Sequence, residues 1–70
     1  MIVVDASAIV AILAEEPEGG ALMAALEGES HMTTAPVAVY EAALGLARVL
    51  RLSVQDAETS VMEFLRLALL

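Results

Sequence analysis

The chain begins with a continuous apolar run, MIVVD, which meets its first charge at Asp5. A run without alternation is typical of a strand that is buried on both faces, as strands are in a parallel sheet. The next apolar stretch, SAIVAILA at residues 7–14, has the length of a short helix, and Ser7 is the residue expected to cap it. This start favours an α/β fold, in which helices cover a parallel sheet.

The remainder of the chain continues the alternation of strands and helices. Pro17 disfavours helix at the residue before it and separates the first two helices. Pro36 in a first turn and a capping box that opens at Ser53 mark the starts of the last two helices. The expected order is strand, helix, helix, strand, helix, helix, with strands at residues 1–5 and about 31–34 and helices at 7–14, about 18–27, about 36–51 and about 54–69.

Length and composition restrict the class of protein. The chain has 70 residues, of which 60% are hydrophobic, and it has no cysteine. A chain this short buries only about 60% of its unfolded surface, so we expect its apolar residues to share a core with further chain or with a partner.

No uncharged apolar run approaches the ~18 residues of a membrane span. No basic segment precedes the first apolar run. We therefore expect a cytoplasmic protein with no membrane partner.

The net charge of −7, with three Arg and no Lys, argues against autonomous binding to nucleic acid. If the chain handles a polyanion, metal ions, further chain or a partner must supply cations.

Asp5 lies at the carboxyl end of the first predicted strand. In open α/β sheets this edge is where ligands bind. The same position also suits a residue that caps the following helix or lies beside its positive N-terminus. Position alone leaves both interpretations open.

Glu41 lies in a predicted helix, PVAVYEAALGLARVL, that is apolar on nearly every face, and Tyr40 is expected in the core. A helix that is apolar all round is typically buried. A buried carboxylate is costly unless it is paired or bound to a metal. Gly45, one turn further along, leaves space beside Glu41. We therefore expect Glu41 to be a buried site residue, and the alternative is a surface Glu on one wet stripe of the helix.

Two carboxylates that converge on one point are suited to Mg²⁺ or Mn²⁺, because these hard cations take oxygen ligands and keep several waters. Such a site can orient and deprotonate water for phosphodiester cleavage. Asp5 and Glu41 are the candidate metal ligands.

The segments MIVVDASAIVAILAEEPE and TTAPVAVYEAALGLARVL resemble the N-terminal half of PIN-domain proteins, and most closely VapC toxins of bacterial type II toxin–antitoxin pairs. The resemblance implies a parallel-sheet PIN-like fold and a Mg²⁺- or Mn²⁺-dependent endoribonuclease. It implies that Asp5 and Glu41 bind the metal and that the Ser7 hydroxyl supports the cluster by hydrogen bonding. The implied partners are an RNA substrate, a cognate antitoxin that blocks the site, and a second copy of the chain.

Members of the family are longer, and their remaining site aspartates lie in later strands and helices. We therefore expect residues 1–70 to be the N-terminal half of a single PIN-like domain, truncated and inactive alone.

Two other functions are open. The first is a non-catalytic interaction module, which binds an antitoxin or a second copy of the chain. A phosphotransferase with an aspartyl nucleophile is less favoured, because its usual second Asp is replaced by Ser7 and the chain has no Lys.

Overall fold

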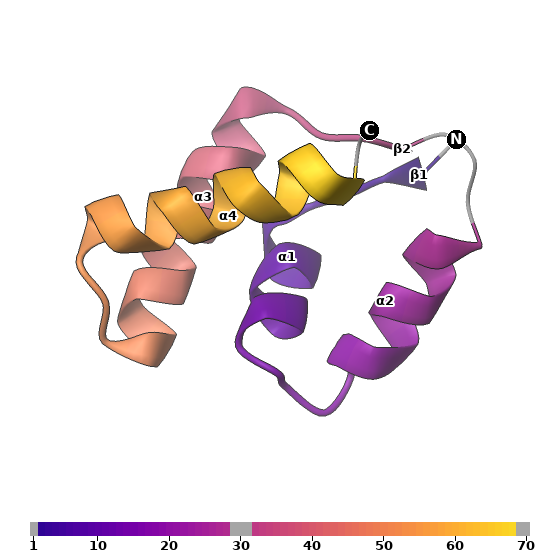
Figure 1. Ribbon diagram of the computed structural model, residues 1–70, viewed down its shortest axis with the longest axis horizontal. Coiled ribbons are helices and arrows are strands. Elements are labelled where there is room, and N and C mark those ends of the chain that lie inside the picture. The colour runs from indigo at the N-terminus through magenta and orange to yellow at the C-terminus, as the bar shows by residue number, and fades with distance from the viewer. Residues whose placement is uncertain (1, 29–31, 69–70) are drawn as a thin grey trace.

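The computed structural model describes residues 2–28 and 32–68 (Figure 1). The predicted order of strands and helices is confirmed, and the bounds of the first three helices differ from the predicted ones by no more than one residue. Residue 1, the predicted strand start at residue 31 and the predicted helix end at residue 69 lie outside the described residues. The elements are β1 (Ile2–Val3), α1 (Ala6–Leu13), α2 (Gly19–Glu27), β2 (Met32–Thr33), α3 (Pro36–Leu50) and α4 (Val54–Ala68).

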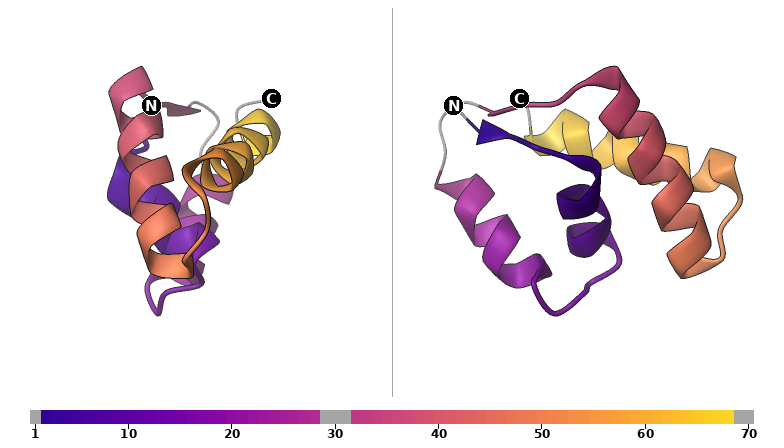
Figure 2. Two further views of the ribbon diagram at one scale, coloured as in Figure 1. Left: turned by 90° about the vertical axis from the view of Figure 1, so that its left-hand side faces the viewer. Right: turned by 180° about the vertical axis from the view of Figure 1, so that it is seen from behind.

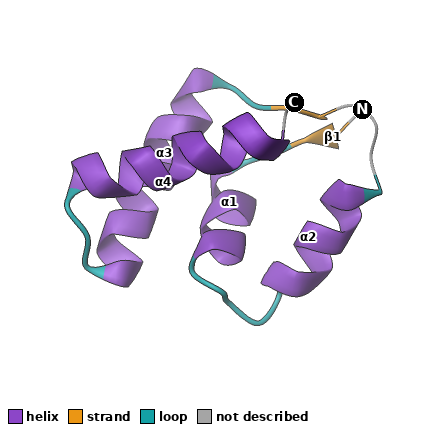
Figure 3. Cartoon of the chain, in the orientation of Figure 1, coloured by secondary structure: helices purple, strands orange, loops and turns teal. Residues whose placement is uncertain are grey.

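The strands β1 and β2 run parallel, with Ile2 opposite Met32 and Val3 opposite Thr33. Within residues 2–28 and 32–68 this short pair is the whole sheet, and helices form most of the structure (Figure 3). The PIN-like parallel sheet that the sequence predicts is therefore present only as this pair.

The prediction that the first strand is buried on both faces is wrong. Val3 is 71% exposed, whereas Val4 is buried. Successive side chains of extended backbone point to opposite faces. Val4 faces the helices and joins their core, while Val3 lies on the side that no described element covers.

Helix α1 is the centre of the fold, because it packs against each of the other three helices (Figures 1 and 2). Helices α3 and α4 pack against each other on one side of α1, and α2 lies on the other side. Helix α4 contributes one stripe of apolar side chains to this core. Buried side chains on the three packed helices are Ile9 and Ala11 of α1, Ala42, Ala43 and Leu46 of α3, and Ala57, Val61 and Leu65 of α4.

Local signals place the last two helices where the sequence predicts them. Pro36 occupies the first turn of α3, where its missing N–H leaves no hydrogen bond unmade. The Ser53 hydroxyl accepts a hydrogen bond of 3.0 Å from the backbone N–H of Asp56 and so caps α4. None of the described helices combines the length and the apolar character that crossing a membrane requires.

Candidate functional site

Helices α1 and α3 begin at the same edge of the strand pair. Two hydrogen bonds join the chain there: the backbone N–H of Val4 donates to the Thr33 carbonyl at 2.8 Å, and the Thr34 hydroxyl donates to the Val4 carbonyl at 2.8 Å. Because the strands are parallel, their carboxyl ends meet at this edge, which is where ligands bind in α/β folds. Asp5 follows directly on one side, and the helix that carries Glu41 follows on the other.

Asp5 is the N-cap of α1. Its Oδ1 accepts hydrogen bonds from the backbone N–H of Ala8 at 3.0 Å and from the Ser7 hydroxyl at 2.8 Å. The interpretation of Asp5 as a helix cap is therefore confirmed, and the prediction that Ser7 caps the helix is wrong. The helix begins at Ala6, one residue earlier than predicted, so Ser7 lies inside it and donates to the capping carboxylate.

The same hydrogen bonds keep the Asp5 carboxylate charged. The Ala8 N–H, and after it the Ser7 hydroxyl, lower the pKa of Asp5 below its usual 3.8, because both donate to the ionised form. Both bonds fall on Oδ1, and neither uses Oδ2. Capping the helix is thus compatible with binding a cation through the second oxygen.

Glu41 is exposed, so the prediction that it is a buried carboxylate is wrong. Tyr40, expected in the core, is 60% exposed. The buried side chains of α3 form one stripe, Ala42, Ala43 and Leu46, which faces α1 and α4. The opposite face is uncovered although it is rich in apolar residues. Glu41 is therefore a surface carboxylate, the alternative that the sequence left open.

Glu41 lines an open groove between α1 and α3. The groove is about 370 Å³ in volume, and its lining residues are Ala6, Ser7, Val10, Glu16, Glu18, Glu41 and Gly45. The side chain of Val10 in α1 fills the space beside Gly45. A Cβ on residue 45 would lie only 3.2 Å from Cγ2 of Val10. Gly45 thus lets α1 approach α3 closely enough to place Ser7 and Glu41 along one groove.

Glu16 and Glu18 also line this groove, from the turn after α1. From the sequence, the three glutamates around Pro17 are most simply a solvated turn, and contact of one of them with the site is left open.

Asp5 lines a different hollow, between β1, α1 and α2, with Val4, Ala8 and Leu26 among its walls. The structure therefore does not place Asp5 and Glu41 in one cavity. Ser7 connects them, because it donates to Asp5 and also lines the groove of Glu41.

Within the described residues, no group of three or more His, Cys, Asp or Glu side chains is placed to hold a metal ion. One or two carboxylates with several waters are sufficient for Mg²⁺.

The sequence profile of the PIN domain matches residues 2–70. The chain belongs to the PIN domain family. PIN domains have nuclease-type functions in general and use divalent metal ions. Comparison of this PIN domain with curated proteins and with solved structures gives no match.

Proposed function

We propose that this PIN domain contributes Asp5, Ser7 and Glu41 to the active site of a Mg²⁺- or Mn²⁺-dependent endoribonuclease, a VapC-type toxin of a toxin–antitoxin pair. One observation carries the proposal: Ser7 holds the Asp5 carboxylate at the strand edge and lines the groove that contains Glu41. Family membership supports the nuclease class, and the resemblance to VapC supports the finer assignment.

In this proposal, Asp5 and Glu41 supply the carboxylate oxygens that hold the ion. Ser7 fixes the side chain of Asp5 through Oδ1, and the carboxylate so held would be a ligand of the ion. An ion held by these residues would supply the activation of water and the stabilisation of charge that phosphodiester hydrolysis requires. Both carboxylates are exposed, so RNA can approach them without any rearrangement of the core.

We further propose that residues 1–70 are the N-terminal half of the domain and do not cleave RNA alone. This is supported by the described residues, among which no group of three or more His, Cys, Asp or Glu side chains is placed to hold a metal ion. The proposed partners are RNA, a cognate antitoxin that covers the site, and a second copy of the chain, and the proposed location is the cytoplasm.

An interaction module without catalysis is the second candidate, and exposed apolar side chains favour it. Val37, Tyr40, Met62 and Leu67 are each more than half exposed. Exposed apolar side chains on two neighbouring helices can contribute to a contact with another protein.

Titration of the chain with Mn²⁺ by calorimetry tests the leading proposal. We expect binding to be lost in Asp5→Asn and in Glu41→Gln, and to be retained in Glu63→Gln, which removes an exposed carboxylate of α4. Asn caps a helix about as well as Asp, so Asp5→Asn removes the charge without removing the cap. Equal Mn²⁺ binding by all variants would favour the interaction module. RNA cleavage that Asp5→Asn abolishes would show that the chain is active alone.

A further inference from the structure

The outer face of α3 carries an unusual set of exposed residues. Val37, Tyr40, Glu41 and Arg48 are all exposed. Their spacing along the helix puts them on one side, opposite the buried stripe. Figure 2 shows α3 at the outside of the molecule, with α4 on the other side of it. An aromatic ring, a candidate metal ligand and a cation therefore share one solvent-facing surface.

The C-terminal end of this helix also carries two of the three arginines of the chain. The chain has three cationic side chains in all. Arg48 lies in the last turn of α3 and Arg51 is its C-cap residue, and both are exposed. Arg48 is about 10 Å along the helix axis from Glu41. The chain has a net charge of −7, but these two arginines make the C-terminal end of α3 locally positive.

A role in helix stability accounts for part of this set. Cations near the C-terminus of a helix interact favourably with its dipole, and this applies to Arg48. It does not account for Tyr40, whose side chain is 60% exposed next to Glu41. Leaving an aromatic ring in water forgoes the free energy that its burial would provide.

We propose that single-stranded RNA binds along the outer face of α3, with a base stacked on Tyr40 and phosphates bound by Arg48 and Arg51. The proposal rests on the proposed nuclease site, because it directs the RNA backbone past Glu41. Stacking on an aromatic ring needs bases that are not paired, which selects single strands. It tolerates any base, because each base has a face that can stack. Tyr40 and the arginines are positioning residues for the substrate.

Binding of a fluorescein-labelled single-stranded RNA of mixed sequence, measured by fluorescence anisotropy in EDTA, tests the proposal apart from cleavage. We expect Tyr40→Ala to weaken binding about tenfold and Tyr40→Phe, which keeps the ring, to retain it. Arg48→Gln and Arg51→Gln should each reduce the slope of log K against log salt concentration by about 0.7, the value for one phosphate contact on a single strand.

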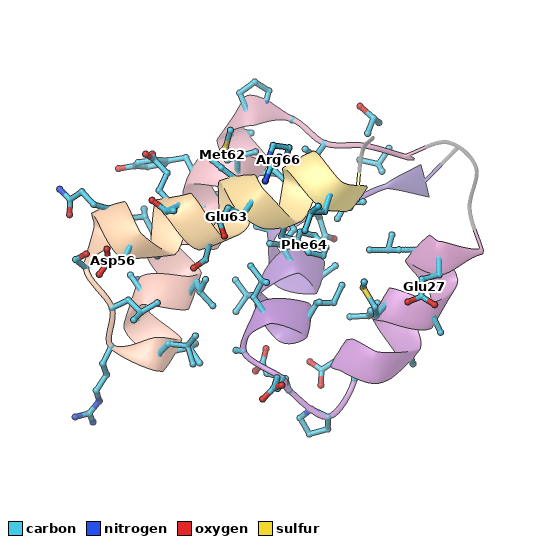
Figure 4. All side chains as sticks on the ribbon, viewed as in Figure 1. Glu27, Asp56, Met62, Glu63, Phe64 and Arg66 are labelled. Carbon is cyan, nitrogen blue, oxygen red and sulfur yellow. The ribbon has the colours of Figure 1, made fainter. Side chains whose placement is uncertain are left out.

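Arg66→Gln is the matched control. Arg66 is the third cation, and it projects from α4, the helix that lies in front of α3 in Figure 4. Its removal changes the net charge by the same amount as Arg48→Gln, so it should leave the slope unchanged if the contact is specific to α3. Circular dichroism of each variant checks that these exposed substitutions leave the helices intact.

Three results would overturn the proposal: no binding of RNA at low salt, an equal loss of slope in Arg66→Gln, or unchanged affinity in Tyr40→Ala. If Tyr40→Ala instead lowers the oligomeric state in sedimentation while RNA affinity is unchanged, the face contacts a second copy, and the proposal is wrong. The Mn²⁺ titration is done without RNA. A failure of the metal site and a failure of the RNA path are therefore distinguishable.

Discussion

The Ser7 hydroxyl donates to Oδ1 of Asp5 at 2.8 Å, and the backbone N–H of Ala8 donates to the same oxygen at 3.0 Å. One carboxylate oxygen thus caps the N-terminus of α1, and the same hydrogen bonds fix the Asp5 side chain at the strand edge. The capping function needs an acceptor at this position, whereas binding of a cation needs the negative charge. Substitutions that keep the acceptor and remove the charge can separate the two roles.

Asp5→Ala should lower the free energy of unfolding by about 1 kcal/mol, because it removes the N-cap of α1. Asp5→Asn should lower it less, since the amide oxygen accepts the same two hydrogen bonds and only the contribution of the negative charge is lost. Urea denaturation followed by circular dichroism measures both. An equally large loss in Asp5→Asn would show that the charge at the helix N-terminus, and not the hydrogen bonds, stabilises α1.

The lowered pKa of Asp5 makes stability depend on pH in one direction. The folded state holds the proton less tightly than the unfolded state, whose carboxyl has the usual value of 3.8. The stabilisation is therefore present in full above this value and is lost as the pH falls through the lower pKa of the folded state. Denaturation curves recorded at neutral pH and at a series of values below 3.8 should show this loss in the wild-type chain. Asp5→Asn should show a smaller loss over the same range, because it has no carboxyl to protonate there.

The order and bounds of the helices could be predicted because their signals are local. Pro17 lies between the first two helices, Pro36 begins the third, and Ser53 caps the last. Each acts through the backbone of its immediate neighbours. The boundary at α1 was predicted one residue late because Asp5 and Ser7 are both good N-caps, and their spacing alone does not decide between them.

Burial could not be predicted in the same way. The helix α3 is apolar on most faces, so its sequence does not indicate which face packs against α1 and α4. Tyr40 and Glu41 proved to be on the uncovered face. The candidate site was found from the position of Asp5 and from the single carboxylate of α3, and the metal roles of both residues stay predictions.

The Thr34 hydroxyl joins the two strand ends next to the site. It donates to the carbonyl of Val4 at 2.8 Å in partly buried surroundings. Thr34→Val keeps the shape and removes the donor, so we expect a loss of about 1 kcal/mol in the free energy of unfolding. Thr34→Ser keeps the hydroxyl and should retain most of the stability. Hydrogen exchange at the backbone N–H of Val4, which donates to Thr33, should become faster in Thr34→Val and stay slow in Thr34→Ser. Unchanged exchange in both variants would mean that the strand pair does not depend on this side chain.

Gly19 and Gly20 begin α2 side by side, and the same substitution should have opposite effects at the two positions. A Cβ at Gly19 would lie 2.6 Å from the carbonyl oxygen of Ala11, a backbone atom that already accepts the N–H of Glu16 at 2.9 Å. Gly19→Ala must therefore displace α2 from α1, and we expect it to lower the free energy of unfolding by about 1–3 kcal/mol.

A Cβ at Gly20 would meet no atom within 4 Å. Gly20→Ala should raise the free energy of unfolding by up to about 1 kcal/mol, because Ala has the higher helix propensity and restricts the unfolded chain. Urea denaturation of both variants under the same conditions compares them directly. Stabilisation by Gly19→Ala would show that α2 does not pack against the backbone of α1 at Ala11. The entry to α2, which also positions Glu16 and Glu18 at the groove, would then be less constrained than the structure indicates.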